Sequence, residues 1–515
     1  MTPVFMTSDY VVMIAYSLIV IVLGVIFSMK ENDTADYLLG GRNIPWWAIA
    51  ISMVVTLFSA ISFVSIPGEA YKHGLGLWIG GLLGILFIPL GLTMFLGFYY
   101  RLGSFTPYEY LERRFSPKVR LSASILFLAT RAFYLAIVLY ASAKAFEAAV
   151  GWPVWITILL TGVLGTLYTT MGGMKAVVWT DVLQFVVLIG GVGAAIIGLV
   201  SNVDGGFTGI ITYSFQNGRG FNLGLDFLSL DPHKRVTLWL LILGAMGATL
   251  SNFASDQLTI QRLLSTKNLS EAKRAAYTNM LIIFPLISVF WFIGLGLFAY
   301  YSQAGAEVAK ASGLTGDKAF PYFIATMLPS PVPGLIMAGL FAAVMSTLDS
   351  GINSLSAVVL KDIYKRFIKP NASELQQLVI AKKLTVLWAV FMISVALGIN
   401  WISEQAVTTI MELSGIWGGL AGTLLGIFIL GVTTTRINSF KVLTVAIISV
   451  VVLFLSSWLF YYGIESDKRF SFIIIGNSGF IVTVLAGYFL CLFSKRLPEE
   501  EIQNLTLLTL TAKTK

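Results

Sequence analysis

The sequence is poor in the residues from which soluble enzymes and disulfide-bonded domains build their sites. It has one cysteine, Cys491, in 515 residues, which excludes an intrachain disulfide and any metal site made of several cysteines. It has two histidines, His73 and His233, and both lie outside the apolar runs described below. Charged residues make up 12% of the chain, about half the share that a soluble domain carries. These absences disfavour a soluble domain and a metalloenzyme.

Long apolar runs take up most of the chain. Apolar residues make up 57% of the sequence, and the mean hydropathy is +0.83. A run of about 20 apolar residues is long enough to cross the hydrocarbon core of a bilayer as a helix. The sequence therefore predicts an all-α polytopic membrane protein with about 13 transmembrane helices. The expected spans are residues 8–28, 45–65, 76–100, 120–149, 152–171, 179–200, 237–256, 276–301, 333–356, 381–402, 408–432, 440–462 and 471–493.

Lysine and arginine are distributed unevenly between the two sides of these spans. With the N-terminus outside, the inner segments and their edges hold 24 of the 34 basic residues, Arg262 among them, and the outer segments hold eight. Because cytoplasmic loops are enriched in these residues, we expect a multi-pass protein of the plasma (inner) membrane with its N-terminus outside and its C-terminus in the cytoplasm. The net charge of +8 then reflects contact with anionic lipid of the bilayer, and gives no reason to expect nucleic acid binding.

Spans two to six and seven to eleven can be paired as two groups of five. The first member of each group is interrupted by polar or glycine-rich residues, at 56–59 in one group and at 244–252 in the other. Interrupted helices at matching positions of two halves are typical of transporters built from inverted repeats, whose binding sites lie at the breaks. The pairing therefore predicts a transporter.

An oxygen-rich stripe interrupts the apolar run 333–356. On a helix, Ala343, Ser346, Thr347 and Ser350 fall within one arc of about 100°, with Asp349 at its edge. A carboxylate at membrane depth needs a partner, such as a cation or another charge. Hard oxygen ligands suit a small hard cation, and sodium is the first candidate. The alternative is that the hydroxyls only allow close helix packing or bond back to carbonyls four residues earlier.

Arg131 lies inside an apolar run, roughly 16 Å from its start at 1.5 Å per residue, and therefore near the middle of the bilayer. An arginine at that depth should face a cavity and pair with an anion. Its planar fork fits a carboxylate bidentately. We therefore expect either a substrate carboxylate or a buried acid, such as Asp349, as its partner.

Several motifs resemble those of the sodium:solute symporter family, and they occur in the same order along the chain. The resemblance runs from about residue 8 to 495 and is nearest to the bacterial sodium-coupled sialic acid transporters of that family. The motifs are PWW at 45–47, SMVVTLFSA at 52–60, GGMKAVVWTDVLQ at 172–184, DQ at 256–257, QR at 261–262 and STLDSGINS at 346–354.

The resemblance implies a five-plus-five inverted-repeat core with a broken first helix in each repeat, one leading helix and two trailing helices. The expected domains are a leading transmembrane helix and inner loop at 1–44, the transport core at 45–432 and the trailing helices at 433–493. A cytoplasmic tail, expected to be solvated or loosely docked, follows at 494–515.

The resemblance also implies a sodium site between the break of the first core helix and the eighth core helix. Its ligands would be the backbone carbonyls of Val55, Phe58 and Ala343 and the hydroxyls of Ser346 and Thr347. An unwound turn leaves carbonyls free to act as such ligands.

Sialic acid transporters of the family carry a second sodium site, which Asp181, Ser346, Asp349 and Ser350 match here. Asp349 departs from the serine more usual at its position. Asp181 has an alternative role in the first turn of a helix, paired with Lys175. We therefore expect one sodium site and a possible second one, whose ligands match those of the family less closely.

The family's sialic acid transporters bind the substrate carboxylate with an arginine that Arg131 matches, and Ser59 and Ser62 match hydroxyls that bind sialic acid. We therefore expect a sodium-coupled symporter that imports a small organic anion, namely sialic acid (N-acetylneuraminate), by alternating access. Leu57 and Gly81 replace polar residues of close sialic acid relatives, which keeps monocarboxylate, pantothenate, proline and sugar as alternatives.

Two other classes of membrane protein are disfavoured by the sequence. An intramembrane enzyme would need converging acid–base or metal-binding residues, and no such motif appears. A channel would need a filter, and the spans contain no repeated filter sequence.

Overall fold

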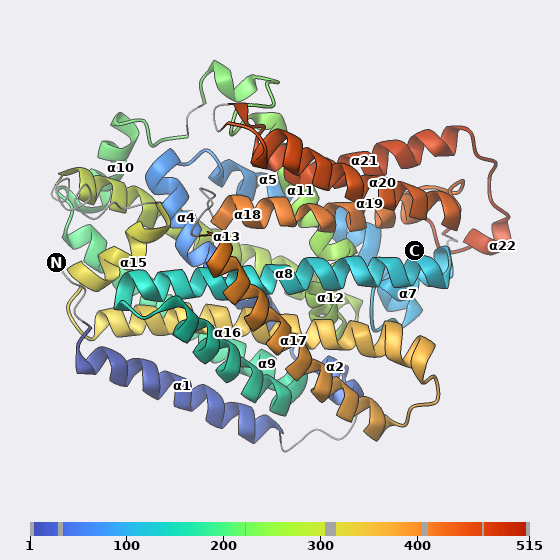
Figure 1. Cartoon of the computed structure of the whole chain (residues 1–515), viewed down its shortest axis with the longest axis horizontal. Coiled ribbons are helices and arrows are strands. Elements are labelled where there is room, and N and C mark those ends of the chain that lie inside the picture. Colours follow the sequence, from blue (N-terminus) through green and yellow to red (C-terminus); the bar gives the residue numbers. More distant parts are fainter. Residues whose placement is uncertain are drawn as a thin grey trace.

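The computed structural model describes residues 5–28, 34–221, 223–303, 316–403, 410–465 and 468–510. These residues are mostly helical and contain no strand. The long helices run side by side along the longest axis of the molecule (Figure 1). The predicted all-α fold is therefore confirmed.

Each expected apolar run has a helical counterpart. Among the described residues, nine helices are long and apolar enough to cross a membrane, and two bent helix pairs pass the same test as pairs. Two shorter apolar helices, Thr7–Leu23 and Val154–Leu167, match the two runs that remain. The number of membrane crossings itself stays a prediction.

The elements follow the expected order of a leading helix, two groups of five spans and two trailing helices. The leading helix is α1 (Thr7–Ser28). The first group consists of α3 (Trp46–Leu57) with α4 (Ala60–His73), α5 (Trp78–Gly91) continued by the π-helical η2 (Leu92–Leu96) and α6 (Gly97–Leu102), α8 (Pro117–Val150), and α9 (Val154–Ser201), which covers two expected spans.

The second group begins after residue 237. It consists of α11 (Leu238–Ala254) with α12 (Gln257–Leu264), α13 (Leu269–Gln303), α16 (Val332–Val358) continued by the π-helical η4 (Val359–Ile368), α17 (Glu374–Ser403), and α18 (Ile410–Trp417) with α19 (Gly419–Thr433). The trailing helices are α20 (Ser439–Ser457), extended by η5 (Trp458–Tyr462), and α21 (Phe472–Leu492). Short connecting helices are α2 (Thr34–Leu39), η1 (Gly40–Arg42), α7 (Tyr108–Arg114), α10 (Gly206–Gln216), η3 (Leu225–Leu228), α15 (Gly316–Met327) and α22 (Glu499–Ile502).

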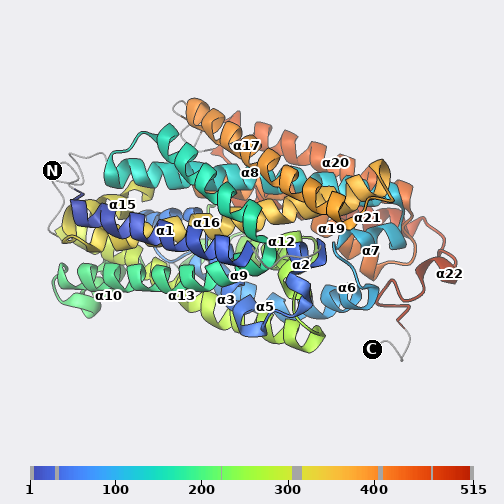
Figure 2. The same ribbon diagram turned by 90° about the horizontal axis from the view of Figure 1, so that it is seen from below.

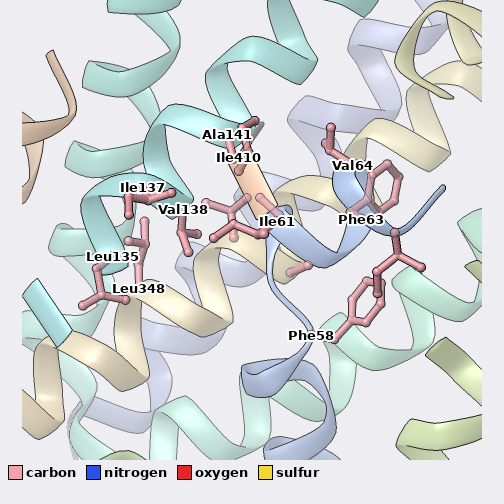
Figure 3. Close-up of a cluster of buried hydrophobic side chains, with 14 of the residues drawn as sticks. Phe58, Ile61, Phe63, Val64, Leu135, Ile137, Val138, Ala141, Leu348 and Ile410 are labelled. Atoms are coloured by element: carbon pink, nitrogen blue, oxygen red, sulfur yellow. The ribbon is translucent and has the colours of Figure 1, made fainter. Parts of the chain in front are cut away.

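The first expected break lies between α3 and α4. Phe58 and Ser59 have ψ angles of 90° and 175°, and the two helices meet at 60°. The apolar side chains around the break hold it in place, since Phe58 and Phe63 pack against Phe290 of α13 with ring centroids 4.5 and 5.4 Å away. Figure 3 shows Phe58 and Phe63 directed away from α8 and Ile61 directed toward it. The span continues to His73, so this histidine lies at its end and not outside it.

The second break lies at Ser255–Asp256, and the prediction that it lies within 244–252 is wrong. Residues 244–252 are helical in α11, which meets α12 at 49°. Asp256 starts α12 because its side chain accepts a hydrogen bond from the Leu258 amide, as an N-cap does. The glycines of α11 serve a different purpose, since a Cβ on Gly244 would meet Ile473 of α21 at 3.1 Å.

The expected spans 152–171 and 179–200 are joined without a loop. One helical element, α9, covers both and changes direction at Gly173, whose φ of 47° and ψ of −161° are non-helical. Glycine adopts a positive φ without the steric cost that other residues carry. A single residue, Gly173, therefore makes the break between the two expected spans.

The centre of the bundle is α16. Almost all of its side chains are buried, and it packs against α1, α8, α9 and α17. Figure 2 shows α1 lying along α9 and α16 on the outside of the bundle. The outer faces of α1, α17 and α20 expose large apolar side chains, such as Leu18, Leu387 and Ile447, as lipid-facing helices do.

The described part of the C-terminal tail is folded back onto the bundle. The Leu507 amide donates to the Val432 carbonyl at 2.8 Å, and the Tyr110 hydroxyl donates to the Leu505 carbonyl at 2.8 Å. Ile502 is fully buried. The tail up to residue 510 therefore ties α7 to the end of α19 and is more firmly docked than expected.

Candidate functional site

The oxygen-rich stripe of α16 faces the end of α3. The Thr347 hydroxyl lies 3.0 Å from the Ala343 carbonyl and 3.1 Å from the Thr56 carbonyl. Both Ser346 and Thr347 are fully buried. The bond to Ala343 is the back-bonding alternative, whereas the contact with Thr56 brings the hydroxyl to the broken helix. Thr347 therefore makes both contacts, the back-bond within α16 and the contact with the end of α3.

The backbone beside Thr347 leaves the helical path. The last hydrogen bond of α3 joins the Phe58 amide to the Val54 carbonyl at 2.9 Å, and the chain then turns at Phe58. The carbonyls of Val55 and Phe58 therefore lie at and beyond a helix end, where carbonyls have no helical partner. Together with the Ala343 carbonyl and the two hydroxyls of α16, these atoms offer neutral hard oxygens of the kind that bind sodium.

Thr56 joins the two helices, which the sequence did not predict. Its hydroxyl lies 3.1 Å from Ser346 Oγ and 3.2 Å from Ser350 Oγ. A polar residue one position from Val55 in the interrupted segment was the available signal.

Asp181 lies beside Ser346, about two turns beyond the break of α9 at Gly173. One oxygen accepts from Ser346 Oγ at 2.5 Å, and the other accepts from Ser52 Oγ at 2.5 Å. These two partners come from α16 and α3, so a role in the first turn of a helix does not describe Asp181. The structure brings Asp181, Ser346 and Ser350 together.

Arg262 of α12 completes this group and was placed by the sequence among the basic residues of the inner segments. Its Nη2 lies 3.3 Å from Asp181 Oδ2 and also donates to Ser350 Oγ, while its Nε donates to Ser52 Oγ at 2.8 Å. Its side chain is 1% exposed. A guanidinium therefore lies where a cation bound by Asp181 and Ser350 would also lie. A buried carboxylate on α9 that needed a partner was the available signal.

Asp349 points to a different neighbour. Its Oδ1 lies 2.6 Å from the Thr169 hydroxyl of α9, and it is fully buried. Its Oδ2 has no hydrogen-bond partner among the described residues. Neither Arg131 nor Asp181 contacts this carboxylate, so the four predicted ligands of the second site do not converge in this structure.

A cavity of about 430 Å³ lies beside the two breaks, between α8, α11, α18, α19 and α21. Arg131 lines it, as expected, and its Nη2 lies 2.5 Å from Asp256 Oδ2. The Tyr134 ring lies 5.3 Å from the guanidinium. The partner of Arg131 is thus a buried acid, but it is Asp256 and not Asp349.

The two predicted substrate-binding serines do not line this cavity. Ser59 is buried and lies behind Tyr134, whose hydroxyl donates to Ser59 Oγ at 3.2 Å. Ser62 is absent from the cavity walls, whereas Leu57 forms part of them. Neutral polar residues of the cavity wall include Asn252 of α11, Ser414 of α18 and Asn477 of α21.

Three charged side chains, which we call the Arg235 cluster, connect the helices at one end of the cavity. Arg235, just before α11, lies 2.7 Å from Glu69 of α4 and 2.5 Å from Glu412 of α18. Its guanidinium lies 5.3 Å from the ring of Phe472, which lines the cavity. Burial lowers the pKa of Arg235, but the two carboxylates outweigh burial and raise it above the usual value.

Comparisons with known proteins show what the chain as a whole is similar to. The model of the sodium:solute symporter family matches residues 37–449. The sodium/sialic acid symporter NanT of Aliivibrio fischeri is 31% identical over 98% of this chain and 96% of its own. The sodium-coupled monocarboxylate transporter 1 of Mus musculus is 31% identical over 85% of this chain and 71% of its own.

One solved structure has the same fold as this chain over almost the full length of this chain. It is a substrate-bound, outward-open Na⁺-coupled sialic acid symporter, with a TM-score of 0.85 and 30% identity. The match covers 96% of this chain and 100% of that one. The order of spans and breaks described above is therefore that of a known transporter fold.

Proposed function

The chain belongs to the sodium:solute symporter family, and on that basis we propose that it imports sialic acid together with sodium ions by alternating access. Sodium is the coupling ion. The observation that carries the substrate assignment is Arg131, a cationic fork in the wall of a cavity large enough for a small organic anion. The likeness to sodium/sialic acid symporters over nearly the whole chain supports the same substrate.

We propose that the first sodium ion binds between α3 and α16. Its ligands are the carbonyls of Val55, Phe58 and Ala343 and the hydroxyls of Ser346 and Thr347. The fit is supported by the chemistry of these five groups, which are neutral and hard, and by the contact of Thr347 with the unwound end of α3. A bound sodium ion would hold the two repeats together at the break.

The second sodium ion is proposed to bind at Asp181, Ser346 and Ser350. Asp349 joins them once its carboxylate leaves Thr169. Arg262 contacts Asp181 and Ser350, so the ion and the guanidinium compete for the same oxygens. Sodium release toward the cytoplasm would then let Arg262 return to Asp181.

The transport cycle needs only a difference in sodium and substrate affinity between two conformations. We assign the moving core to residues 45–432 and the trailing helices to 433–493. The protein lies in the plasma membrane with its N-terminus outside, in agreement with the excess of basic residues in the inner segments. Two sodium ions and one carboxylate would move one net positive charge per cycle.

Uptake into proteoliposomes tests the proposal. Labelled sialic acid should accumulate under an inward sodium gradient and not under a potassium gradient, and the uptake should saturate. Steady sodium current without substrate would indicate a channel. Absence of sodium-driven sialic acid uptake would contradict the proposed substrate.

A monocarboxylate is the second candidate substrate. It is favoured by Leu57, an apolar side chain in the cavity wall where a polar one was expected. The likeness to a sodium-coupled monocarboxylate transporter agrees with it. A thermal-shift screen of sialic acid, pantothenate, proline, lactate and galactose, with and without sodium, separates the candidates.

A further inference from the structure

Asp256 places a negative charge directly beside Arg131 in the cavity wall. Its carboxylate Oδ2 lies 2.5 Å from Arg131 Nη2, and its side chain is 8% exposed. Both residues line the cavity. The pair is neutral as a whole, so a ligand carboxylate that reaches Arg131 also comes close to the carboxylate of Asp256.

The start of α12 holds Asp256 in this position. Its Oδ1 accepts from the Leu258 amide at 3.2 Å, and its Oδ2 lies 3.5 Å from the Thr259 hydroxyl. These two contacts fix the side chain to the first turn of α12, as an N-cap does. Asp256 therefore stays at the cavity wall when a ligand arrives.

A plain monocarboxylate suits this pair poorly. Two carboxylates at one arginine repel each other, and moving Asp256 away would break a largely buried ion pair. A ligand with a hydroxyl or amide N–H next to its carboxylate avoids both costs, because it donates to Asp256 and accepts from Arg131. In the described part of the chain Arg131 donates through Nη2, so its Nε and Nη1 remain for the ligand.

We infer that Asp256 is a specificity-determining residue, which with Arg131 selects acids that carry a hydrogen-bond donor next to the carboxylate over plain monocarboxylates. The inference rests on the proposed function, since it concerns the same cavity. Sialic acid belongs to the selected class, because the carbon that bears its carboxylate also bears a hydroxyl. Among the described residues, Arg131 and Asp256 are the only charged ones that line the cavity, so any selection by charge falls to this pair.

The wild-type protein in proteoliposomes gives the first test. Two pairs of competitors differ in the hydroxyl next to the carboxylate: sialic acid and its 2-deoxy-2,3-didehydro form, and lactate and propionate. One hydrogen bond to a charged group is worth about tenfold or more in affinity. The hydroxylated member of each pair should therefore inhibit uptake of labelled sialic acid at roughly tenfold lower concentration. Equal inhibition within both pairs would overturn the inference.

Asp256→Asn tests the residue itself. Asparagine keeps the N-cap and the size of the side chain but removes the charge. The ratio of the inhibitory concentrations within each pair of acids, which measures the preference for the hydroxylated member, should therefore fall toward one. Asp231→Asn, at a partly exposed aspartate before α11, is the matched control and should keep the wild-type preference. Asp256→Ser, another good N-cap, serves if the asparagine variant does not fold. A wild-type preference in either Asp256 variant would overturn the inference.

The failure of the proposed function is distinguishable from the failure of the inference. If the wild-type protein takes up no sialic acid, the ligand-induced rise in its unfolding temperature still compares lactate with propionate. A larger rise with lactate that disappears in Asp256→Asn supports the inference without sialic acid. An equal rise with both acids overturns it.

Discussion

Arg262 Nη2 lies 3.3 Å from Asp181 Oδ2, and the two side chains are 1% and 0% exposed. The pair joins α12 of the second repeat to α9 of the first, and its two members contact Ser346 and Ser350 of the stripe of α16. Ser52 and Ser350 satisfy further donors of the guanidinium. A buried charge pair with hydrogen-bonded partners is costly to break, because removal of one member leaves the other charge unpaired.

Arg262→Ala should therefore destabilise the protein by about 3–5 kcal/mol. The measurement is the unfolding midpoint in detergent without sodium, where Arg262 is the one basic side chain that pairs with Asp181 among the described residues. The double variant Arg262→Ala with Asp181→Asn should recover part of the loss, since it removes the unpaired carboxylate. A single variant that unfolds like the wild type would contradict the importance of the pair.

Thr347→Ala should raise the sodium concentration for half-maximal uptake by about tenfold, the equivalent of one lost oxygen ligand. Thr347→Ser is the matched control, because it keeps the hydroxyl that lies 3.1 Å from the Thr56 carbonyl. Sodium titrations of uptake at fixed substrate concentration provide the measurement. Equal half-saturation in the alanine variant and the wild type would remove Thr347 from the first site.

The second sodium site predicts a Hill coefficient for sodium near two in the wild type and near one in Asp181→Ala. Asp349→Ser should keep the wild-type coefficient, because a serine at this position still offers a hydroxyl oxygen to the ion and leaves Asp181, Ser346 and Ser350 unchanged. The same sodium titrations measure all three proteins. An Asp181→Ala coefficient equal to that of the wild type would falsify the second site.

Arg131→Ala should reduce the ratio kcat/KM for sialic acid uptake by about 100-fold or more, since a charge-assisted hydrogen bond contributes up to about 3 kcal/mol. Arg131→Lys should restore little of it, because an ammonium group cannot present the planar fork of a guanidinium. Wild-type uptake by the alanine variant would mean that Arg131 serves only as the partner of Asp256.

The sequence predicted local patterns of this site better than its long-range pairs. The stripe at Ser346 and Thr347 was visible because oxygen-bearing side chains at helical spacing stand out in an apolar run. The charged partners of Asp181 and Arg131, which are Arg262 and Asp256, were not visible, since they lie 81 and 125 residues away along the chain. Which buried charge meets which is decided by the packing of helices, and one sequence carries little information about it.

The position of the second break shows a related limit. Glycine-rich residues 244–252 looked like the interruption, but in α11 they allow α21 to approach closely. The break instead depends on Asp256, whose capping role competes with continuation of the helix. Composition alone does not distinguish a glycine that permits packing from one that ends a helix.

Arg235→Ala should open the cavity at the end where the Arg235 cluster lies, because Arg235 holds Glu69 of α4 to Glu412 of α18. A cysteine replacing Ser414 in the cavity wall reports the opening through its rate of reaction with a charged thiol reagent. The chain suits this measurement, since Cys491 is its only cysteine and can be replaced by serine. We expect labelling about tenfold faster in the Arg235→Ala background, equivalent to the loss of about 1.4 kcal/mol from the closed form.

Lys468→Ala, which removes a more exposed ion pair with Glu465, is the control and should leave the rate unchanged. An equal rate in both variants would mean that the Arg235 cluster only supports the fold and does not hold the cavity closed.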